Sequence, residues 1–274
     1  QLVALAGGDV DAIFEFGPEQ LPLAQSIPGK ILPVRTAYCL VCRMQVDVPP
    51  FDDARVRKAV QLAVDNSAVA EIVFAEDADV GEDHHVSPIH PEYFELEPMI
   101  RDVAESRRLL ADAGYPDGIE LTIDVGNTDG VWQQGVCEAM REQVAEAGIR
   151  LNINLMPPSK YWEIWTATPF GATSWAHRPL GTMVLSQAYR SGVPWNESHF
   201  SSAAFDAALD EAEATFEPEA RRVKMEEVQR LLQESGAIVQ PLWRPIYTMT
   251  AERVHDFPAH PSKYHQLNKT WVEA

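Results

Sequence analysis

The chain has 274 residues, of which 46% are hydrophobic and 23% charged, a composition that predicts an ordinary globular protein and argues against a disordered or collagen-like one. With 41 acidic and 22 basic residues, the formal net charge is −19 at pH 7, which opposes nucleic acid and anionic membranes as main partners. No apolar run in the sequence approaches the roughly 20 residues of a membrane-spanning helix.

The N-terminal residues 2–6 look like the last turns of a helix that two glycines end. Because a domain rarely begins inside a helix, we expect a processed chain or a fragment of something longer. The missing leader sequence therefore gives no argument for a cytoplasmic protein. Strands are predicted at 10–16 and 31–46, and the stiff proline connector at 48–50 is taken as a boundary.

The next segment combines a helix with a long loop. Apolar residues at helical spacing predict a helix over 54–65, with Asp52 or Asp53 as its cap. Residues 75–98 are rich in acidic residues, histidines and prolines and predict a loop. Loops of this length in compact domains are usually functional or held in place by packing.

A βαβ unit is predicted in the middle of the chain. Asp102 caps a helix over 103–113. The strand pattern at 119–125, the helix at 131–147 and the strand pattern at 149–155 then follow in order. A strand, a helix and a second strand in this order predict a parallel pair.

The C-terminal part continues the alternation of helices and strands. In chain order it is predicted to hold a helix at 161–167 capped by Ser159, a strand at 170–175, helices at 179–191, 203–215 (capped by Ser201 or Ser202) and 218–234, and strands at 238–243 and 246–250. This alternation predicts an α/β fold.

Catalytic signatures are missing from the sequence. It contains no nucleophile elbow, no phosphate-binding loop, no dinucleotide-binding glycine motif and no H-E-x-x-H. Most carboxylates lie between the apolar positions of predicted helices, where solvation explains them. We therefore expect a binding protein with no catalytic residue and no cofactor, and keep an α/β hydrolytic enzyme as an alternative.

Two clusters offer a further alternative, a metal or redox module. Cys39 and Cys42 form a C-x-x-C, but they lie in a predicted strand, which would send the two thiols to opposite faces and favours simple packing. His84, His85 and His90 lie in the long loop and suit a divalent metal. Prolines stiffen that loop, so packing is preferred there too, and we expect no metal.

The tryptophans indicate where a ligand would bind. Seven tryptophans are many for this length, and Trp162 and Trp165 share one short helix. Trp175 ends a predicted strand and is followed by His177 and Arg178. Ligands of α/β sheets collect outside the carboxyl ends of the strands. An indole offers an apolar wall, and a guanidinium offers a planar fork for a carboxylate.

Five segments in register carry a likeness to a known family. They read LAGGDVD at 5–11, PFDDARVRKAV at 50–60, ADAGYPDG at 111–118, WNES at 195–198 with Phe205 and Leu209 following, and the helix at 221–229. Together they resemble the C-terminal half of family 5 extracellular solute-binding proteins, the peptide, oligopeptide and nickel receptors of ABC importers. The likeness spans nearly the whole chain.

The resemblance implies a two-lobed receptor with the type II periplasmic-binding-protein fold, which closes by hinge motion around a ligand. Residues 46–240 would form the large C-terminal α/β lobe. Residues 1–45 would supply hinge strands and part of the N-terminal lobe, and 241–274 would return strands to that lobe. The rest of the N-terminal lobe would be absent from this chain.

The resemblance also implies a ligand site and partners. Family receptors for peptides carry a G-W-x-x-D motif whose aspartate pairs with the ligand ammonium; here that position holds Arg178. We therefore expect a peptide-like or carboxylate-bearing solute. The expected ligand-binding residues are Trp175, Arg178, His177, Trp195, Asn196 and Tyr161. Implied further are a monomer, an inner-membrane ABC permease as partner, and a periplasmic or extracellular location with a lipid anchor as an option.

Overall fold

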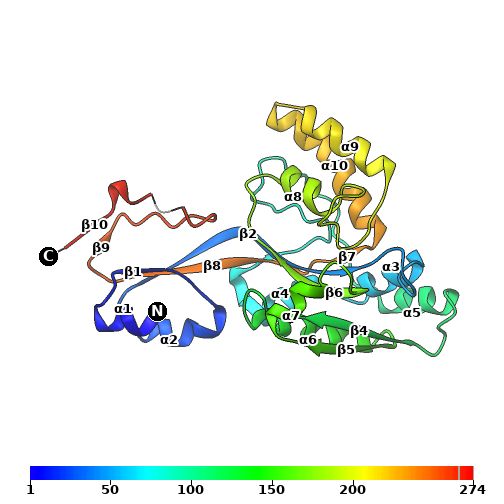
Figure 1. Cartoon of the computed structure of the whole chain (residues 1–274), viewed down its shortest axis with the longest axis horizontal. Coiled ribbons are helices and arrows are strands. Elements are labelled where there is room, and N and C mark those ends of the chain that lie inside the picture. Colours follow the sequence, from blue (N-terminus) through cyan, green and yellow to red (C-terminus); the bar gives the residue numbers. More distant parts are fainter. Residues whose placement is uncertain (265, 274) are drawn as a thin grey trace.

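Two long antiparallel strands organise the molecule. The computed structural model describes residues 1–264 and 266–273. The strands β2 (Lys30–Met44) and β8 (Leu242–Thr250) pair along their length and run from a smaller part of the molecule into a larger one (Figure 1). Segments from both ends of the chain therefore meet in the smaller part.

The smaller part is built on the outer ends of β2 and β8. The strand β1 (Ala12–Phe16) pairs antiparallel with β8. Around it lie α1 (Leu2–Gly7), η1 (Pro18–Gln20), α2 (Leu21–Gln25), β9 (Val254–His255), η3 (Leu267–Lys269) and β10 (Trp271–Val272). The predicted helical start is confirmed, and α1 ends at Gly8, whose φ of 77° is left-handed.

The larger part extends the same sheet. Its strand order is β1-β8-β2-β6-β4-β5. The inner members are β4 (Ile119–Val125), β5 (Ile149–Leu155) and β6 (Phe170–Trp175), and short strands β3 (Asp79–Val80) and β7 (Ile238–Val239) pair with β8 and β2. The strand β4 is parallel to both β5 and β6, which confirms the predicted βαβ unit.

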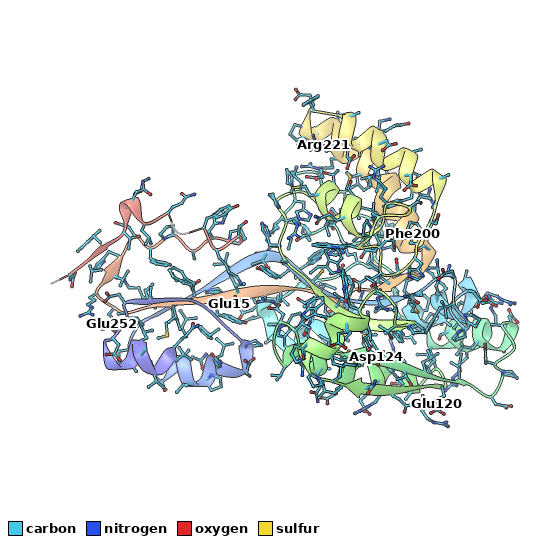
Figure 2. The ribbon with its side chains drawn as sticks, viewed as in Figure 1. Glu15, Glu120, Asp124, Phe200, Arg221 and Glu252 are labelled. Atoms are coloured by element: carbon cyan, nitrogen blue, oxygen red, sulfur yellow. The ribbon has the colours of Figure 1, made fainter. Side chains whose placement is uncertain are left out.

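Helices cover both faces of this sheet. They are α3 (Ala54–Leu62), α4 (Asn66–Phe74), η2 (Ala75–Asp77), α5 (Val103–Asp112), α6 (Trp132–Ala145), α7 (Pro158–Ile164), α8 (Gly181–Ala188), α9 (Ala203–Ala214) and α10 (Pro218–Ser235). Figure 1 shows α8, α9 and α10 on one side of β2 and β6, and α4 and α6 on the other. Figure 2 places Phe200 beside the first group and Asp124 in the sheet.

The helix caps confirm most predicted boundaries. Asp53 accepts from the Arg55 amide, and Asp102 from the Glu105 amide. Ser202 caps α9 through the Phe205 amide. The prediction for Ser159 is wrong. The helix predicted at 161–167 is α7, which begins at Pro158, before Ser159, and a proline in this first position needs no amide partner.

One helix and one pair of strands also differ from prediction. The helix α4 was missed because its apolar residues are not confined to one face: Val69 and Phe74 are buried, whereas Ile72 is 68% exposed; Asp65 caps it. The strands predicted at 238–243 and 246–250 divide instead at 240–241, and Pro245 lies inside β8. Pro245 lies opposite an irregularity in β2 between Val34 and Tyr38, where the regular pairing that needs an amide donor is interrupted.

The side chains of β2 alternate between two cores. Leu40 and Cys42 pack with the helices α3 to α6, whereas Cys39 and Val41 pack with α8 to α10. Burial raises the pKa of the Cys39 thiol well above its ordinary value, with the charge of Glu197 adding to the shift. The interpretation of Cys39 and Cys42 as packed thiols on opposite faces is confirmed; both are free and buried.

Candidate functional site

A cavity of about 420 Å³ opens where β6 ends. Its lining residues are Trp162, Trp165, Thr173, Ser174, Trp175, Ala176, Arg178 and Trp195. They come from the end of β6 and the residues that follow it, from α7 and its C-cap, and from the loop before α9. Because β4, β5 and β6 are parallel, their carboxyl ends meet at this edge, which is where α/β sheets bind ligands.

Four indoles form a chain around the cavity. The ring centroids of Trp162 and Trp165 lie 5.6 Å apart, and those of Trp165 and Trp195 lie 6.1 Å apart. Trp195 also lies 6.1 Å from Trp175. All three contacts are edge-to-face, which leaves parts of the ring faces exposed to a guest. Trp162 and Trp195 keep 45% and 46% of their surface exposed.

Three of the predicted ligand-binding residues, Trp175, Arg178 and Trp195, line this cavity, and their contact with a ligand stays a prediction. The Trp175 indole N–H donates to Glu197 Oε1 at 2.8 Å. Arg178 is the single charged residue among the described lining residues. Its guanidinium donates only to Gln187 Oε1 at 3.3 Å and to two nearby carbonyls, and no described carboxylate lies within ion-pair distance. The guanidinium is therefore free to bind an acidic group.

Three other predicted site residues lie outside the lining. Tyr161 is fully buried, with its hydroxyl 2.6 Å from Thr173 Oγ1. The Asn196 amide donates to the Phe200 carbonyl at 2.6 Å and holds the loop before α9. His177 accepts from the Ala37 amide at 3.0 Å, and burial lowers its pKa, with help from His260 and Arg178. Ligand contact by these three residues stays a prediction.

Sequence reasoning singled out Trp162 and Trp165 but left them out of the predicted site. Their three-residue spacing on one short helix was the signal that could have included them. Glu197 was missed entirely. Its position directly after Trp195 and Asn196 was a weak signal, because an acidic residue in a loop is normally solvated.

The three histidines of the loop at 75–98 do not converge on one site. His85 bonds Cys39 Sγ at 3.1 Å and the Tyr189 hydroxyl at 2.7 Å. His84 contacts Glu82, and His90 donates to the Arg178 carbonyl. Across residues 1–264 and 266–273, no group of three His, Cys, Asp or Glu side chains converges as a metal site would require.

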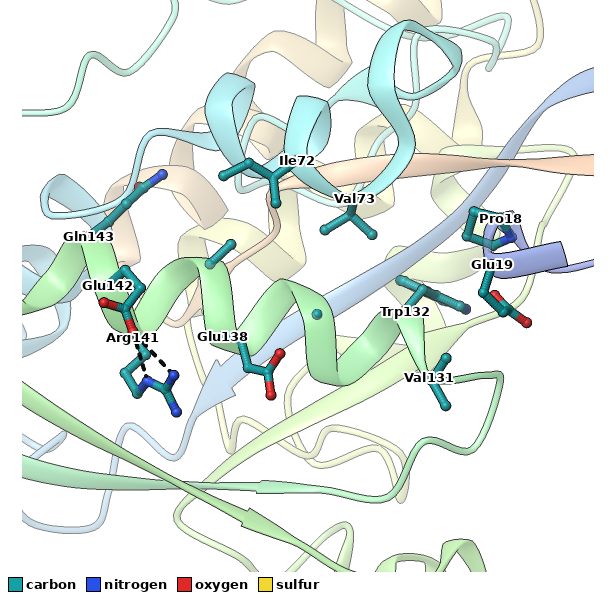
Figure 3. Close-up of a pocket in the computed structure, with 12 residues that line it drawn as sticks. Pro18, Glu19, Ile72, Val73, Val131, Trp132, Glu138, Arg141, Glu142 and Gln143 are labelled. Carbon is teal, nitrogen blue, oxygen red and sulfur yellow. Dashed lines mark hydrogen bonds and ion pairs between the residues drawn. The ribbon is translucent and has the colours of Figure 1, made fainter. Parts of the chain in front are cut away.

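A second cavity of about 610 Å³ lies between α4 and α6 (Figure 3). Ile72 and Val73 of α4 face the helix that carries Trp132. Its charged side chains do not converge, and Arg141 is paired with the neighbouring Glu142. Its lining extends from these helices to Pro18 and Glu19 of the smaller part, whereas the aromatic cavity lies at the carboxyl end of β6, so we take the aromatic cavity as the candidate site.

A charged cluster links the cavity to the smaller part. Ser174 donates to Asp129 Oδ2 at 3.0 Å, and Arg244 Nε donates to the same oxygen at 3.0 Å. Arg244 also pairs with Glu15 at 2.8 Å, and Glu15 receives Lys263. Although burial opposes it, these two cations lower the pKa of Glu15. Figure 2 places Glu15 beside β8 in the smaller part.

Among the described residues, none of the helices combines the length and the apolarity needed to cross a bilayer.

Comparison with known proteins gives relatives along most of the chain. The chain is 27% identical over 207 residues to the glutathione-binding protein GsiB of Salmonella choleraesuis, covering 69% of this chain and 39% of that protein. It is 22% identical over 276 residues to the probable deoxycholate-binding periplasmic protein YgiS of Escherichia coli, covering 97% and 51%. The chain thus spans about half or less of these relatives.

Solved structures show the same fold. The ABC transporter substrate-binding protein CtaP of Listeria monocytogenes matches with a TM-score of 0.88 at 15% identity, over 99% of this chain and 57% of that one. The oligopeptide-binding protein AppA of Bacillus subtilis, in complex with a nonapeptide, matches with 0.82 at 16% identity, over 100% and 58%. This chain therefore has the α/β fold of type II periplasmic binding proteins.

A family profile described as "Bacterial extracellular solute-binding proteins, family 5 Middle" matches residues 1–195, well over half of the chain. The expected resemblance and the expected fold are both confirmed. This chain belongs to the family 5 extracellular solute-binding proteins.

Proposed function

We propose that this chain supplies one side of the ligand site of an ABC importer's substrate-binding protein and captures a peptide-like or carboxylate-bearing solute. The observation that carries the proposal is the aromatic cavity at the end of β6, whose described lining contains one charged side chain, Arg178. Family membership supports a binding role. GsiB is named for glutathione, and AppA was solved with a nonapeptide.

The chemistry of the cavity indicates the class of solute. Indole edges and faces bind an apolar or planar body through its area and its electrostatics. The Arg178 guanidinium donates to a carboxylate in a bidentate manner and repels an ammonium group. A solute with an acidic group next to an apolar body satisfies both features. A peptide held by its N-terminal ammonium at this position does not.

The chain would also take a defined place in the two-lobed receptor. Residues 46–240 act as the large C-terminal lobe. Residues 1–45 supply hinge strands and part of the N-terminal lobe, and residues 241–274 return strands to that lobe. Closure of the two lobes buries the solute and presents a surface to an inner-membrane permease. The receptor works as a monomer in the periplasm or outside the cell, either free or lipid-anchored.

A hydrolytic or redox role is less favoured, although one contact among the described residues resembles a nucleophile beside its base. Cys39 Sγ lies 3.1 Å from His85 Nε2, as a thiol nucleophile lies near its base. However, Cys39 and His85 are 0% and 1% exposed. Burial, with the charges of His90, His84 and Arg178, lowers the pKa of His85 to about 3, and the thiol pKa is raised. A base this weak cannot hold the proton of the thiol.

The test is the change of Arg178 to alanine in the full-length receptor. A charge-assisted pair is worth about 1.5–3 kcal/mol. We therefore expect the affinity for an acidic solute to fall roughly ten- to a hundredfold. Calorimetry with glutathione, short peptides and their C-terminal amides measures it. The wild-type protein should prefer acid over amide, and Arg178→Ala should lose that preference.

Arg150→Ala is the matched control, because it removes the same charge from the exposed edge of β5, where Arg150 pairs with Glu120. Its affinity should equal that of the wild-type protein. If Arg178→Ala keeps both its affinity and its preference for the acid, Arg178 has no part in the site.

A further inference from the structure

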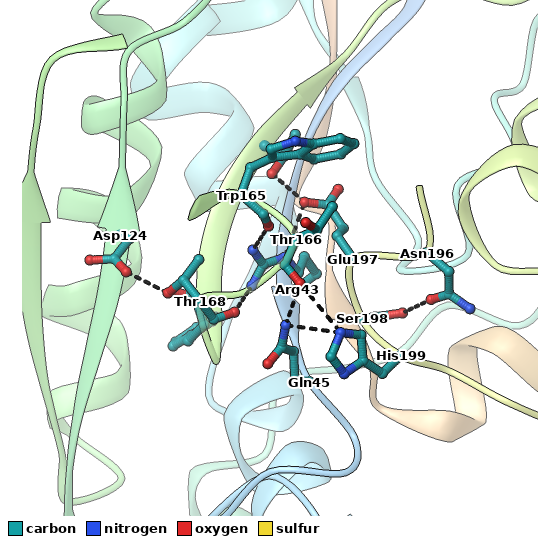
Figure 4. Close-up of polar contacts among 12 residues, drawn as sticks. Arg43, Gln45, Asp124, Trp165, Thr166, Thr168, Asn196, Glu197, Ser198 and His199 are labelled. Atoms are coloured by element: carbon teal, nitrogen blue, oxygen red, sulfur yellow. Dashed lines mark hydrogen bonds and ion pairs between the residues drawn. The ribbon is translucent and has the colours of Figure 1, made fainter. Parts of the chain in front are cut away.

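A buried ion pair contacts several residues that line the aromatic cavity, and Figure 4 shows it next to Trp165. Arg43 of β2 and Glu197 of the loop before α9 have 0% and 3% of their side chains exposed. Arg43 Nε donates to Glu197 Oε2 at 3.0 Å. Neither residue belongs to the cavity lining. Since both charges are removed from water, the pair carries a desolvation cost that a pair of apolar side chains would avoid.

Arg43 holds the chain that carries Trp165. Its Nη1 donates to the Thr168 carbonyl at 2.7 Å, and its Nη2 donates to the Trp165 carbonyl. Figure 4 shows the guanidinium between this turn and Glu197. These carbonyls follow α7 and would otherwise be unpaired at the helix end. One side chain thus fixes both the turn after α7 and the carboxylate of Glu197.

Glu197 holds the other side of the cavity. Its Oε1 accepts from the Trp175 indole N–H at 2.8 Å, and its Oε2 accepts from the Thr173 hydroxyl at 2.5 Å. Glu197 also follows Trp195 by two positions, and the Trp195 ring contacts both Trp165 and Trp175. Three of the four indoles are therefore tied to one ion pair.

We propose that the Arg43–Glu197 ion pair is the positioning device of the aromatic cavity and that Glu197 sets the orientation of the Trp175 ring. The consequence for solute affinity rests on the function proposed above; the consequence for the indoles does not. Both residues act through the tryptophans and touch no solute. The planar guanidinium of Arg43 is required, because it donates to two carbonyls and one carboxylate at the same time. A lysine ammonium has all its donors on one atom and cannot reach all three acceptors.

The experiment compares Glu197→Gln and Arg43→Lys with a stability control, Val144→Ala, in the full-length receptor. Val144 is buried in α6, in the core on the opposite face of the sheet. All three variants lose stability, so stability alone does not discriminate between them. The discriminating readouts are near-ultraviolet circular dichroism and acrylamide quenching of tryptophan fluorescence without solute, and then solute affinity by calorimetry with glutathione and short peptides.

We expect Glu197→Gln and Arg43→Lys to change the near-ultraviolet spectrum, to raise acrylamide quenching and to lower the affinity for solute at least tenfold. Val144→Ala should leave all three quantities as they are in the wild-type protein. A lysine keeps the positive charge, so a change in Arg43→Lys shows that the fork geometry is required. It also covers the case in which Glu197→Gln does not fold.

Two outcomes separate this inference from the proposed function. If the variants that fold match Val144→Ala in spectrum and quenching, the positioning role is refuted, whatever the wild-type protein binds. If the wild-type protein binds none of these solutes but the spectrum and quenching change only in Glu197→Gln and Arg43→Lys, the positioning role stands and the proposed solute class fails.

Discussion

Arg244 is expected to stabilise the junction between the two parts far more than an ordinary surface arginine. It extends from β8, and its side chain is 5% exposed. Its Nε lies 3.0 Å from Asp129 Oδ2, and its Nη2 lies 2.8 Å from Glu15 Oε1. The guanidinium also stacks over the Tyr38 ring at 4.5 Å and the Trp132 ring at 5.5 Å. We consider the change of Arg244 to methionine, which keeps an apolar stem.

The magnitude follows from what the two carboxylates lose. Removing one partner of a buried ion pair costs about 3–5 kcal/mol. Glu15 and Asp129 are each 29% exposed, and they keep Lys263 and Ser174 as partners. The loss should therefore be at the lower end, about 3 kcal/mol. For a chain of this size, about 2 °C per kcal/mol applies, so Tm should fall by about 6 °C.

The assay is thermal and urea unfolding followed by circular dichroism, with Arg190→Met as the control. Arg190 also bonds two carboxylates, Asp210 at 2.6 Å and Glu213 at 2.9 Å, but its side chain is 26% exposed. More exposed pairs contribute about 0.2–1 kcal/mol, so the control should lose about 2 °C or less. Equal losses in the two variants would refute the argument that burial makes the Arg244 cluster valuable.

Two further predictions concern buried groups around the site. Burial, with nearby positive charges, lowers the pKa of His85 to about 3, so between pH 6.5 and 3 the unfolded state takes up a proton that the folded state does not. Stability should be full above pH 6.5 and fall on acidification by up to ~1.4 kcal/mol per pH unit, and His85→Gln should flatten this fall in Tm between pH 7 and 5; an unchanged slope would contradict the assignment. Tyr161→Phe loses a hydroxyl that lies 2.6 Å from Thr173 Oγ1, which should cost ~1 kcal/mol in urea unfolding and leave solute affinity within about twofold. A tenfold loss of affinity would instead place the Tyr161 hydroxyl against the solute.

Much of the fold could be predicted because its signals are local. Helix ends are marked by bonds made within one turn. Asp102, three residues before Glu105, marks the start of α5, and Gly236 follows the regularly spaced apolar residues of α10 and marks its end. The alternating strands at 119–125 and 149–155 enclose one helix, and a connection of this length is the crossover that a parallel pair needs. The family likeness rests on such local segments too.

Less of the candidate site could be predicted, because most of its contacts join distant segments. Trp175 and Arg178 could be placed at one cavity because they share one stretch of chain at a strand end, and Trp195 was expected beside them. Glu197 was not found, because its partner Arg43 lies 154 positions away and the contact depends on the order β2-β6 in the sheet. For the same reason, the sequence could not show that Tyr161, Asn196 and His177 lie outside the lining of this cavity, and their contact with a ligand stays a prediction.

By itself, the sequence determined most of the elements, the α/β alternation and the family, since capping, period and turn chemistry act over a few residues. Only the tertiary structure decided which side chains face the cavity and which hold it from behind. The sheet order brings β2 beside β6, and this arrangement lets an arginine and a glutamate with no local signature form an ion pair that is linked to three of the four tryptophans. A buried charge is stable only with its partner in place, so its role can be recognised only once the fold has brought the two residues together.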